Sequence, residues 1–162
     1  MNGIKHKIIT DAAFNIVLYQ PEIHANTGNI ARLCGAAEIT LHLIHPLGFK
    51  LDDRHLKRAG LDYWPEIDIR HHECIEAFLS SEEGLPSRLI TFSSHADLDY
   101  TKASVRRGYY LLFGKESIGL PSFIKEKFPC YKIPIWGKVR SLNLSTSVGI
   151  VAYHYLHQIG CF

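Results

Sequence analysis

Apolar and polar positions follow one another along the chain in blocks that are typical of strands alternating with helices. Short apolar runs rich in β-branched and aromatic residues predict strands at residues 14–19, 39–44, 67–70, 88–93, 109–113 and 131–135. Apolar positions spaced three or four residues apart predict helices at residues 26–37, 72–80, 121–128 and 144–159. The polar stretch 94–107 is expected to be a loop. This order predicts an α/β fold with a mostly parallel sheet flanked by helices.

Two of these helices have a recognisable end or face. Asn26 or Thr27 is expected to cap the first helix, since either side chain accepts a hydrogen bond from the free N–H groups of the first turn. The last helix repeats apolar residues along one side, which we expect to be its core stripe: Val148, Val151, Ala152 and Tyr155. The chain has no linker, repeat or low-complexity segment.

The composition is that of a soluble globular protein. The 162 residues are 46% hydrophobic and 21% charged, and 18 Lys and Arg against 16 Asp and Glu give a net charge of +2. This mild basicity neither requires a nucleic-acid partner nor excludes one bound through a local patch. No apolar run approaches the roughly 20 residues that span a bilayer, and the amino-terminal segment lacks the layout of a signal peptide. The four cysteines are scattered singly, which predicts a reduced, cytoplasmic protein; a disulfide is the alternative.

A first polar segment, from Asn26 to Arg32, opens the helix that follows the first strand. Polar residues and Gly28 leave backbone N–H groups exposed at the positive end of the helix, where anions bind. Arg32 lies one to two turns into this helix. The segment predicts either a ligand-binding helix start or an ordinary capped helix with a solvated arginine.

A second segment runs from a buried strand into Gly114, the charged pair Lys115 and Glu116, and then Gly119. Such a loop lets a ligand approach the backbone at the carboxyl end of a strand, where α/β proteins bind their ligands. The glycine spacing matches neither a Walker A loop nor a dinucleotide fingerprint. The alternative is a plain strand–turn–helix junction.

A third segment alternates Ser141, Asn143 and Ser145 with Leu142 and Leu144 just before the last helix. Small polar side chains cap helices, and one or two of these three would be enough for that purpose. The excess indicates a ligand-binding role beside the cap.

Together with residues 58–64, these segments resemble the SPOUT superfamily of RNA methyltransferases, and within it the tRNA (cytidine/uridine wobble)-2′-O-methyltransferase family. The resemblance extends from about Phe14 to Gly160, with the motifs in the order and spacing of the family. The matching motifs are NTGNIAR at 26–32, RAGLDYW at 58–64, LLFGKESIGLP at 111–121 and RSLNLSTSV at 140–148. The resemblance implies a single SPOUT domain over residues 14–162, preceded by an extension over residues 1–13.

The resemblance also implies a deep trefoil knot in the carboxyl-terminal part of the sheet, with S-adenosylmethionine bound bent in the knot by backbone groups of three loops. The residues it assigns to the cofactor are Phe92, Gly114, Glu116, Ile133, Ser141, Asn143 and Ser145. It further implies a homodimer whose interface uses the last helix, including its apolar face, and the helix that starts at Asn26.

The chemistry of 2′-O-methylation defines what the site must do. The methyl group of a sulfonium is already electrophilic, so no metal is expected, and the enzyme must align the ribose 2′-oxygen and help it lose its proton. By resemblance, the catalytic residues are Arg32, Asn26, Glu116, Ser141 and Asn143. Because a guanidinium keeps its proton, we expect Arg32 to orient the hydroxyl and stabilise developing negative charge rather than to act as a base. Asn143 and Glu116 have an alternative role as structural pins of the knot.

An enzyme of this class must also hold anionic tRNA. The candidate phosphate contacts are Arg54, Arg58, Arg106 and Arg107, and solvated surface charge is the alternative for each. Trp64 and Trp136 are expected either to stack on bases or to be buried.

Histidines at two places offer further chemistry. His154 and His157 lie three residues apart on the last helix, but no neighbouring ligand completes a metal site, so zinc is not expected. His71 and His72 are interpreted as part of a solvated helix start.

The sequence therefore predicts a cytoplasmic, dimeric, S-adenosylmethionine-dependent enzyme that methylates the ribose of the wobble nucleotide in the tRNA anticodon stem-loop. The alternatives are the same reaction at another tRNA or rRNA site, a non-catalytic RNA-binding protein of the same fold, and a small-molecule nucleotide-binding protein. The retained Arg32 argues against the second alternative, and the missing glycine fingerprints argue against the third.

Overall fold

A computed structural model describes residues 6–52, 54 and 62–162 of the chain. The described residues form a seven-stranded sheet of order β3-β2-β1-β6-β4-β7-β5, in which every pairing is parallel. The strands are β1 (Asn15–Tyr19), β2 (Thr40–Ile44), β3 (Ile69–His72), β4 (Leu89–Phe92), β5 (Leu98–Asp99), β6 (Tyr110–Phe113) and β7 (Cys130–Lys132). The α-helices are α1 (His24–Ala37), α3 (Ile75–Leu79), α4 (Ser122–Lys127) and α5 (Leu144–Gln158), with short 3-10 helices at Trp64–Glu66, Leu85–Arg88 and Tyr100–Lys102.

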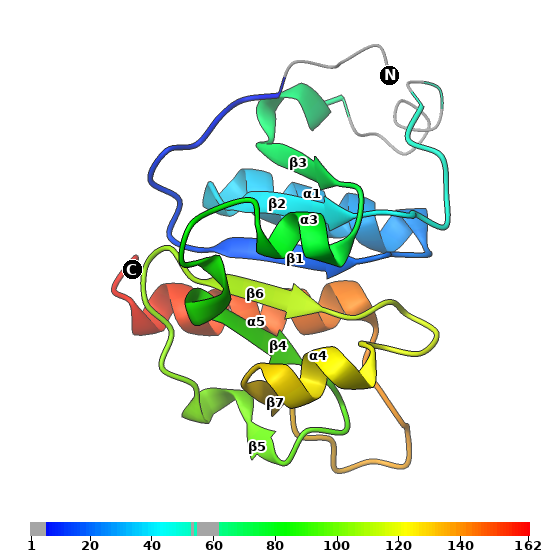
Figure 1. The fold of residues 1–162 in the computed structure, drawn as a ribbon, viewed down its shortest axis with the longest axis vertical. Helices are drawn as coiled ribbons and strands as arrows, with labels where there is room; N and C mark the ends of the chain where they lie inside the picture. The colour runs from blue at the N-terminus through cyan, green and yellow to red at the C-terminus, as the bar shows by residue number, and fades with distance from the viewer. Residues whose placement is uncertain (1–5, 53, 55–61) are drawn as a thin grey trace.

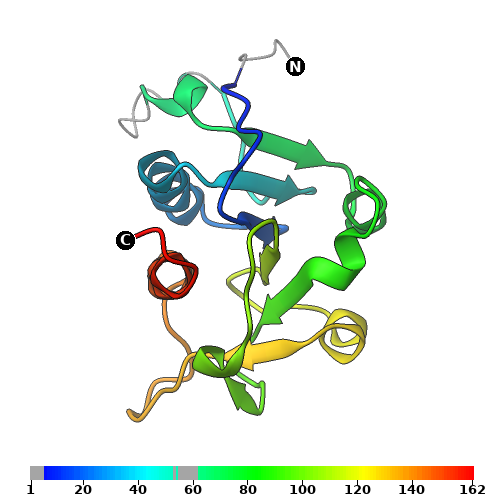
Figure 2. The same cartoon turned by 90° about the vertical axis from the view of Figure 1, so that its left-hand side faces the viewer.

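The helices lie in two layers on opposite faces of the sheet (Figures 1 and 2). Helices α1 and α5 lie side by side on one face, and α3 and α4 cover the other. Each face has its own core cluster of buried residues. The central strands are therefore apolar on both sides, which explains why their sequences are continuous apolar runs rather than alternating patterns.

The parallel arrangement brings the carboxyl ends of the strands to one edge of the sheet (Figure 1). Strands β6, β4 and β7 are direct neighbours. The segments that leave them, which begin at residues 93, 114 and 133, consequently start next to one another. Helix α1 also begins at this edge, after β1, and α5 begins there after the segment that follows β7.

The predicted α/β class and the order of the core strands are confirmed, and four boundaries were wrong. The last strand ends at Lys132 rather than at residue 135. The third strand lies at Ile69–His72 rather than 67–70, because the buried Ile67 and Trp64 belong to the turn before it while the edge strand takes the polar residues. The predicted helix over 72–80 is correspondingly shorter. The predicted loop over 94–107 contains β5, a two-residue strand with no apolar pattern that would reveal it.

The expected cap of the first helix was also wrong. Helix α1 begins at His24 after Ile23, so Asn26 and Thr27 lie inside its first turn, where both are buried. No side chain within the segment caps this helix. The two residues that precede it, Glu22 and Ile23, are instead bound by a distant carboxylate, as described below.

The expected core stripe of the last helix is confirmed. Its four predicted members, Val148, Val151, Ala152 and Tyr155, are each 0% exposed. They pack against the sheet within the same chain, so these side chains are not available to a partner subunit. No described helix is long and apolar enough to cross a membrane.

Residues 6–13 run alongside the segment that leads into β3. The Ile9 N–H donates to the buried carboxylate of Asp68 at 3.0 Å, and the Lys7 N–H donates to the Pro65 carbonyl at 3.0 Å. Asp68 also accepts from Thr40 Oγ1 at 3.1 Å and from Arg70 at 2.8 Å. These bonds hold the pKa of the Asp68 carboxyl below its usual value despite its burial.

Candidate active site at the carboxyl edge of the sheet

Glu116 binds the segment that leads into helix α1 from a distant part of the chain. Its carboxylate accepts the backbone N–H of Glu22 at 2.8 Å and that of Ile23 at 3.1 Å. These two residues immediately precede the helix, so the carboxylate lies near the positive end of the helix dipole. The loop after β6 is thereby fixed to the start of α1.

Asn26 connects Glu116 to the third predicted segment. Its side-chain amide donates to Glu116 Oε1 at 3.2 Å, and its Oδ1 accepts from Asn143 Nδ2 at 3.0 Å. Asn26 is only 5% exposed, so both of its polar atoms have partners where water has little access. The amide therefore joins α1 to two other segments of the chain.

Asn143 caps helix α5. Its Oδ1 accepts the backbone N–H of Ser145 at 2.9 Å and that of Thr146 at 3.3 Å, and it also accepts from the Ser145 hydroxyl at 2.7 Å. One side chain thus caps α5 with its oxygen and binds Asn26 with its nitrogen. The predicted cap is confirmed, and it belongs to a network that links all three polar segments.

A second set of bonds binds the same two loops. The Glu22 carboxylate accepts both the backbone N–H and the hydroxyl of Ser117 at 2.8 Å, and these bonds lower the pKa of the Glu22 carboxyl. The Lys115 ammonium donates to Gln20 Oε1 at 3.2 Å. The segments 20–26 and 114–117 therefore hold each other through reciprocal hydrogen bonds.

Gly114 is packed against its own loop. A Cβ at this position would lie 2.3 Å from the Gly119 carbonyl carbon and 2.4 Å from the Leu120 nitrogen. The loop folds back on itself through a bridge between Lys115 and Gly119. A larger residue at position 114 would therefore displace the loop itself before it met any ligand.

Arg32 lies further along α1, exposed to solvent. Its Nε donates to the Tyr63 hydroxyl at 3.2 Å, and its guanidinium carbon lies 5.2 Å from the centre of the Tyr63 ring. Six residues separate it from Asn26, about 9 Å along the helix axis. Within the described part of the chain, Arg32 has no hydrogen bond to the Glu116–Asn26–Asn143 network.

The remaining residues assigned to the cofactor lie on the segments that leave β4 and β7. Phe92 ends β4 with its side chain in the core, stacked on Phe113 at 4.7 Å between ring centres. Ile133 is half-buried after β7, and Ser141 is exposed two residues before the α5 cap. The structure thus brings the three loops that were predicted to bind the cofactor to neighbouring strand ends.

The predicted phosphate contacts are not brought together. Arg106 and Arg107 are exposed before β6, at the opposite edge of the sheet, and Arg54 is exposed between β2 and β3. Arg58 lies outside the described residues. Among the three that the structure describes, no basic cluster is therefore assembled beside the Glu116–Asn26–Asn143 network.

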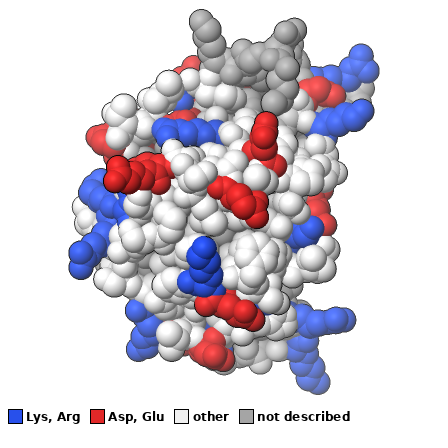
Figure 3. All heavy atoms as spheres, in the orientation of Figure 1, with Lys and Arg blue, Asp and Glu red and all other residues white. Residues whose placement is uncertain are grey.

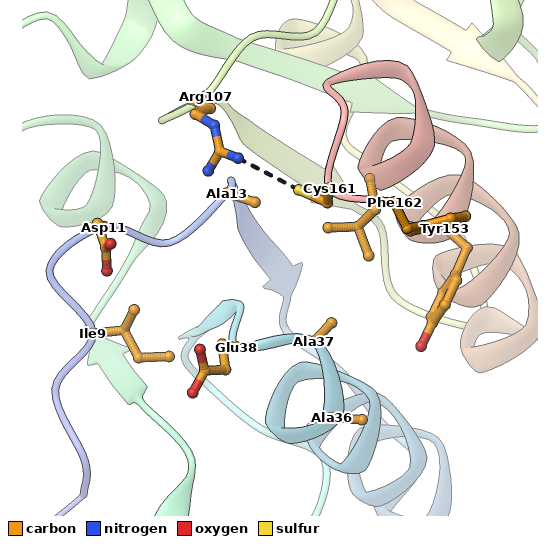
Figure 4. A pocket seen from close by; sticks show the side chains of 11 residues that line it. Ile9, Asp11, Ala13, Ala36, Ala37, Glu38, Arg107, Tyr153, Cys161 and Phe162 are labelled. Atoms are coloured by element: carbon orange, nitrogen blue, oxygen red, sulfur yellow. Dashed lines mark hydrogen bonds between the residues drawn. The ribbon is translucent and has the colours of Figure 1, made fainter.

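A hollow of about 380 Å³ lies at that opposite edge (Figure 4). Asp11 and Glu38 line it together with Arg107, whose guanidinium approaches Cys161 Sγ at 3.6 Å. None of the residues in the Glu116–Asn26–Asn143 network lines this hollow. The candidate active site is therefore at the carboxyl edge of the strands rather than in this hollow.

Within the described ranges, no group of three or more His, Cys, Asp or Glu side chains is placed to hold a metal ion. His154, on α5, lies against the ring of Tyr100, and burial lowers the pKa of the His154 imidazole.

Two residues of this site, Glu22 and Tyr63, have no local sequence signal that indicates their contacts. Glu22 follows Pro21 at the start of α1, a usual place for an acidic residue, but its Ser117 partner is 95 positions away in sequence. Tyr63 belongs to the RAGLDYW motif, yet nothing in the motif indicates that its hydroxyl meets Arg32. Both roles depend on contacts between distant segments.

The fold and this edge define a class: a parallel α/β protein whose ligand edge joins two helix starts and the loop after a central strand. Residues 13–153 match the SpoU rRNA methylase family, and the chain belongs to this family.

Curated relatives cover almost the whole chain. It is 45% identical over 152 residues to the tRNA (cytidine(34)-2′-O)-methyltransferase of Yersinia pestis, spanning 90% of this chain and 94% of that one. It is 42% identical over 149 residues to the Escherichia coli K12 protein of the same name, again spanning 90% and 94%.

Solved structures of methyltransferases have the same fold as this chain. One from work on 2-OH methylation of C/U34 on tRNA superposes with a TM-score of 0.82 at 50% identity, covering 90% of this chain and 95% of the other. The SpoU methyltransferase AviRb of Streptomyces viridochromogenes, in complex with AdoMet, shares the fold with a TM-score of 0.80 at 18% identity. That match covers 93% of this chain and 59% of AviRb.

Proposed function

We propose that this protein transfers a methyl group from S-adenosylmethionine to the ribose 2′-oxygen of the wobble nucleotide of tRNA, a cytidine or modified uridine. Membership of the SpoU family and the names of relatives that span 90% of the chain support this activity. The structural observation behind it is the network of Glu116, Asn26 and Asn143, which joins three family motifs at the ligand edge of the sheet.

The residues at this edge fit the cofactor. The segments after β4, β6 and β7 leave neighbouring strands, which is the arrangement needed for three loops to hold one small molecule. Phe92, Gly114, Glu116, Ile133, Ser141, Asn143 and Ser145 would hold it, largely through their backbone groups. When bound, S-adenosylmethionine supplies an electrophilic methyl group.

Arg32 would act on the ribose. Its guanidinium is exposed and positioned by Tyr63. Planar N–H donors can hold the 2′-hydroxyl and stabilise the negative charge that develops on its oxygen. In this proposal Arg32 orients and stabilises, and it does not abstract the proton.

Asn26, Glu116 and Asn143 would keep the loops in register. Each makes hydrogen bonds that tie a loop to a helix start, so their main contribution is to position the cofactor loops. Ser141 is exposed beside them and is free to contact the cofactor or the ribose.

We also propose that the carboxyl-terminal chain forms the trefoil knot of the family. Strand β7 lies between β4 and β5, two strands that are consecutive in sequence, so the late strand sits inside an earlier connection. Helix α5 then packs against the chain between β5 and β6, where the Tyr155 hydroxyl donates to the Tyr100 carbonyl at 2.7 Å. A crystal structure in which the chain after β7 passes outside the β4–β6 connection would contradict the knot.

The subunit arrangement and the location of the protein belong to the same proposal: a cytoplasmic homodimer with the SPOUT domain at 14–162 and an extension at 1–13. The interface would use the outer surface of α1 and α5, where Ile150 is 36% and Tyr153 is 47% exposed.

Methylation of purified tRNA tests the activity. The protein is incubated with S-adenosylmethionine and tRNA from cells that lack this gene, and ribose methylation is mapped by mass spectrometry. We expect a new 2′-O-methyl group at the wobble position of a subset of tRNAs. A methyl group only at another tRNA position would contradict the wobble nucleotide as the substrate, and no methyl transfer would contradict the tRNA methyltransferase activity.

A further inference from the structure

The segment between β7 and α5 displays an exposed tryptophan. Trp136 is 92% exposed, whereas Trp64, the other tryptophan of the chain, is 3% exposed in the core. Val139, in the same segment, is 64% exposed. Large apolar side chains gathered on one exposed segment are a usual mark of a binding surface.

The charges of this segment are positive and unpaired. Lys138 and Arg140 are both exposed and alternate with Gly137 and Val139. Among the described residues, neither cation has a hydrogen bond or an ion pair. Figure 3 shows basic side chains without acidic neighbours at the corner of the molecule where this segment lies in Figure 1.

The segment leads directly to the candidate active site. Trp136 lies seven positions before Asn143, so the Cα atoms of the two residues are at most about 24 Å apart. A Cβ at Gly137 would meet nothing within 4 Å, so the space around the residue next to Trp136 is open. The indole is thus presented to solvent on the segment that ends at the α5 cap.

We propose that Trp136, together with Lys138 and Arg140, forms a platform on which an unpaired base next to the methylated nucleotide stacks. This inference rests on the proposed function. Unpaired bases of RNA loops bind to proteins by stacking on aromatic side chains, while nearby cations contact the phosphates. An acidic or apolar protein partner would match only half of this surface, whereas RNA supplies both a flat ring and negative charge.

Tryptophan fluorescence tests the platform directly, because only one of the two indoles is exposed. The full-length protein is titrated with an anticodon stem-loop RNA and, in parallel, with a fully paired RNA duplex of equal length. We expect the stem-loop to quench the solvent-exposed emission and to shield it from acrylamide, and the duplex to do neither. In Trp136→Phe the emission of a solvent-exposed indole should be absent, which identifies Trp136 as the source of that emission.

Affinities measured by an independent method complete the test. We expect Trp136→Ala to bind the stem-loop roughly 5- to 100-fold more weakly, and Trp136→Phe to retain most of the affinity. Lys138→Ala should lower the salt dependence of binding by about one phosphate contact, and Lys127→Ala on α4 is the matched control. Circular dichroism establishes that each variant is folded.

Three results would overturn the inference. The first is unchanged emission of Trp136 with unchanged affinity of Trp136→Ala for RNA. The second is a change of emission with protein concentration alone, which would place a second copy of the chain on the indole. The third is a change with S-adenosylmethionine alone, which would make the indole part of the cofactor site. If the wild-type protein transfers no methyl group but the stem-loop still quenches the Trp136 emission, the proposed function is contradicted and the stacking platform is not.

Discussion

Arg32 has an environment suited to negative charge on a substrate. It is exposed on α1, and its described contacts are with the hydroxyl and the ring of Tyr63. No carboxylate of the described residues pairs with it. The tyrosine restricts the side chain while leaving its positive charge unneutralised.

We expect Arg32→Ala to reduce kcat and kcat/KM together, with little change in the affinity for S-adenosylmethionine. An interaction made mainly in the transition state produces this pattern. Loss of one charged donor typically costs about 100-fold or more in rate. Single-turnover methylation at saturating tRNA, with calorimetry for the cofactor, provides the measurement.

Two further variants distinguish a catalytic role of Arg32 from a role in tRNA binding. Arg32→Lys should restore only part of the rate, because an ammonium lacks the planar pair of donors. Arg106→Ala, at the opposite edge, should leave the rate at saturating tRNA unchanged. Wild-type rate for Arg32→Ala under these conditions would make Arg32 a tRNA-binding residue only.

Substitution of Gly114 is expected to affect stability as well as cofactor binding, whereas loss of a cofactor contact alone would affect binding only. We expect Gly114→Ala to weaken binding of S-adenosylmethionine and also to lower the melting temperature, because its Cβ would collide with the Gly119–Leu120 backbone. Overpacking against backbone typically costs about 1–3 kcal/mol. Calorimetry and thermal unfolding measure the two effects.

Gly137→Ala is the matched control, since a Cβ at that position meets nothing within 4 Å. It should leave the melting temperature within about two degrees of the wild type, as expected of a surface change below ~0.5 kcal/mol. If Gly114→Ala loses cofactor affinity but keeps its melting temperature, the loop accommodates the added Cβ and the Cβ instead collides with the bound cofactor.

At the scale of elements, the starts of α1 and α5 depend on each other through Asn143. Asn143→Ala removes the α5 cap and the bond to Asn26 together, so we expect it to lower the free energy of unfolding by about 1–2 kcal/mol. Chemical denaturation of the purified variant provides the value.

Asn143→Asp separates the two functions of this side chain. Its carboxylate can still accept from Ser145 and Thr146, but it has no N–H to donate to Asn26. We expect most of the stability to return while methyl transfer remains impaired. Equal activity in Asn143→Asp and the wild type would show that the link between the helices is dispensable for the reaction.

The edge formed by β2 and β3 contains paired histidines, and the interpretation of His71 and His72 as a solvated helix start was wrong. His42 Nδ1 lies 2.9 Å from His72 Nε2, and His45 Nε2 lies 2.8 Å from His71 Nδ1. Burial first, and neighbouring cations second, lower the pKa of His42 to about 3 and that of His71 to about 4. In each pair one ring must donate and the other accept, so the neutral forms are favoured.

These shifts predict that the protein loses stability in mild acid. A histidine with a depressed pKa in the folded state stabilises the fold fully above its unfolded value near 6.5. As the pH falls below that value, the unfolded chain binds protons that the folded chain refuses. We expect the free energy of unfolding to fall by up to about 1.4 kcal/mol per pH unit for each such group.

Urea denaturation between pH 7 and pH 4.5 measures this slope. His42→Gln should flatten it, because an amide does not titrate and can still bond to Asn15. His95→Gln, which removes an exposed imidazole, is the control for the loss of a histidine as such. An identical slope in His42→Gln and the wild type would exclude His42 as a source of acid sensitivity.

For the whole molecule, we expect a homodimer at micromolar concentration. The reason is not the apolar stripe of α5, which is buried inside the chain, but the outer surface of α1 and α5 with its exposed Ile150 and Tyr153. Light scattering should give about twice the 18.4 kDa of one chain. A charge inserted by Ile150→Asp should weaken the dimer, and an 18.4 kDa species at all concentrations would contradict it.

The sequence by itself determined the order of strands and helices, the α/β class and the core stripe of α5. These features follow from local periodicity: a strand buried on both faces needs a continuous apolar run, and a helix packed on a sheet needs one apolar side. The polar segments at 26–32, 111–121 and 140–148 were also recognisable, because glycine and small polar residues at strand and helix ends are unusual in number there.

Only the tertiary structure decided how these segments meet. Glu116 binds the residue before α1 from 93 positions away, Asn26 joins Glu116 to Asn143, and Trp136 is exposed to solvent while Trp64 is buried. No local pattern distinguishes the two tryptophans or selects the partner of a carboxylate, since burial and pairing depend on which distant segments the parallel sheet places side by side. The same reason explains why β5 was not predicted and why β3 was predicted at the wrong residues, because an edge strand is defined by its neighbour more than by its own residues.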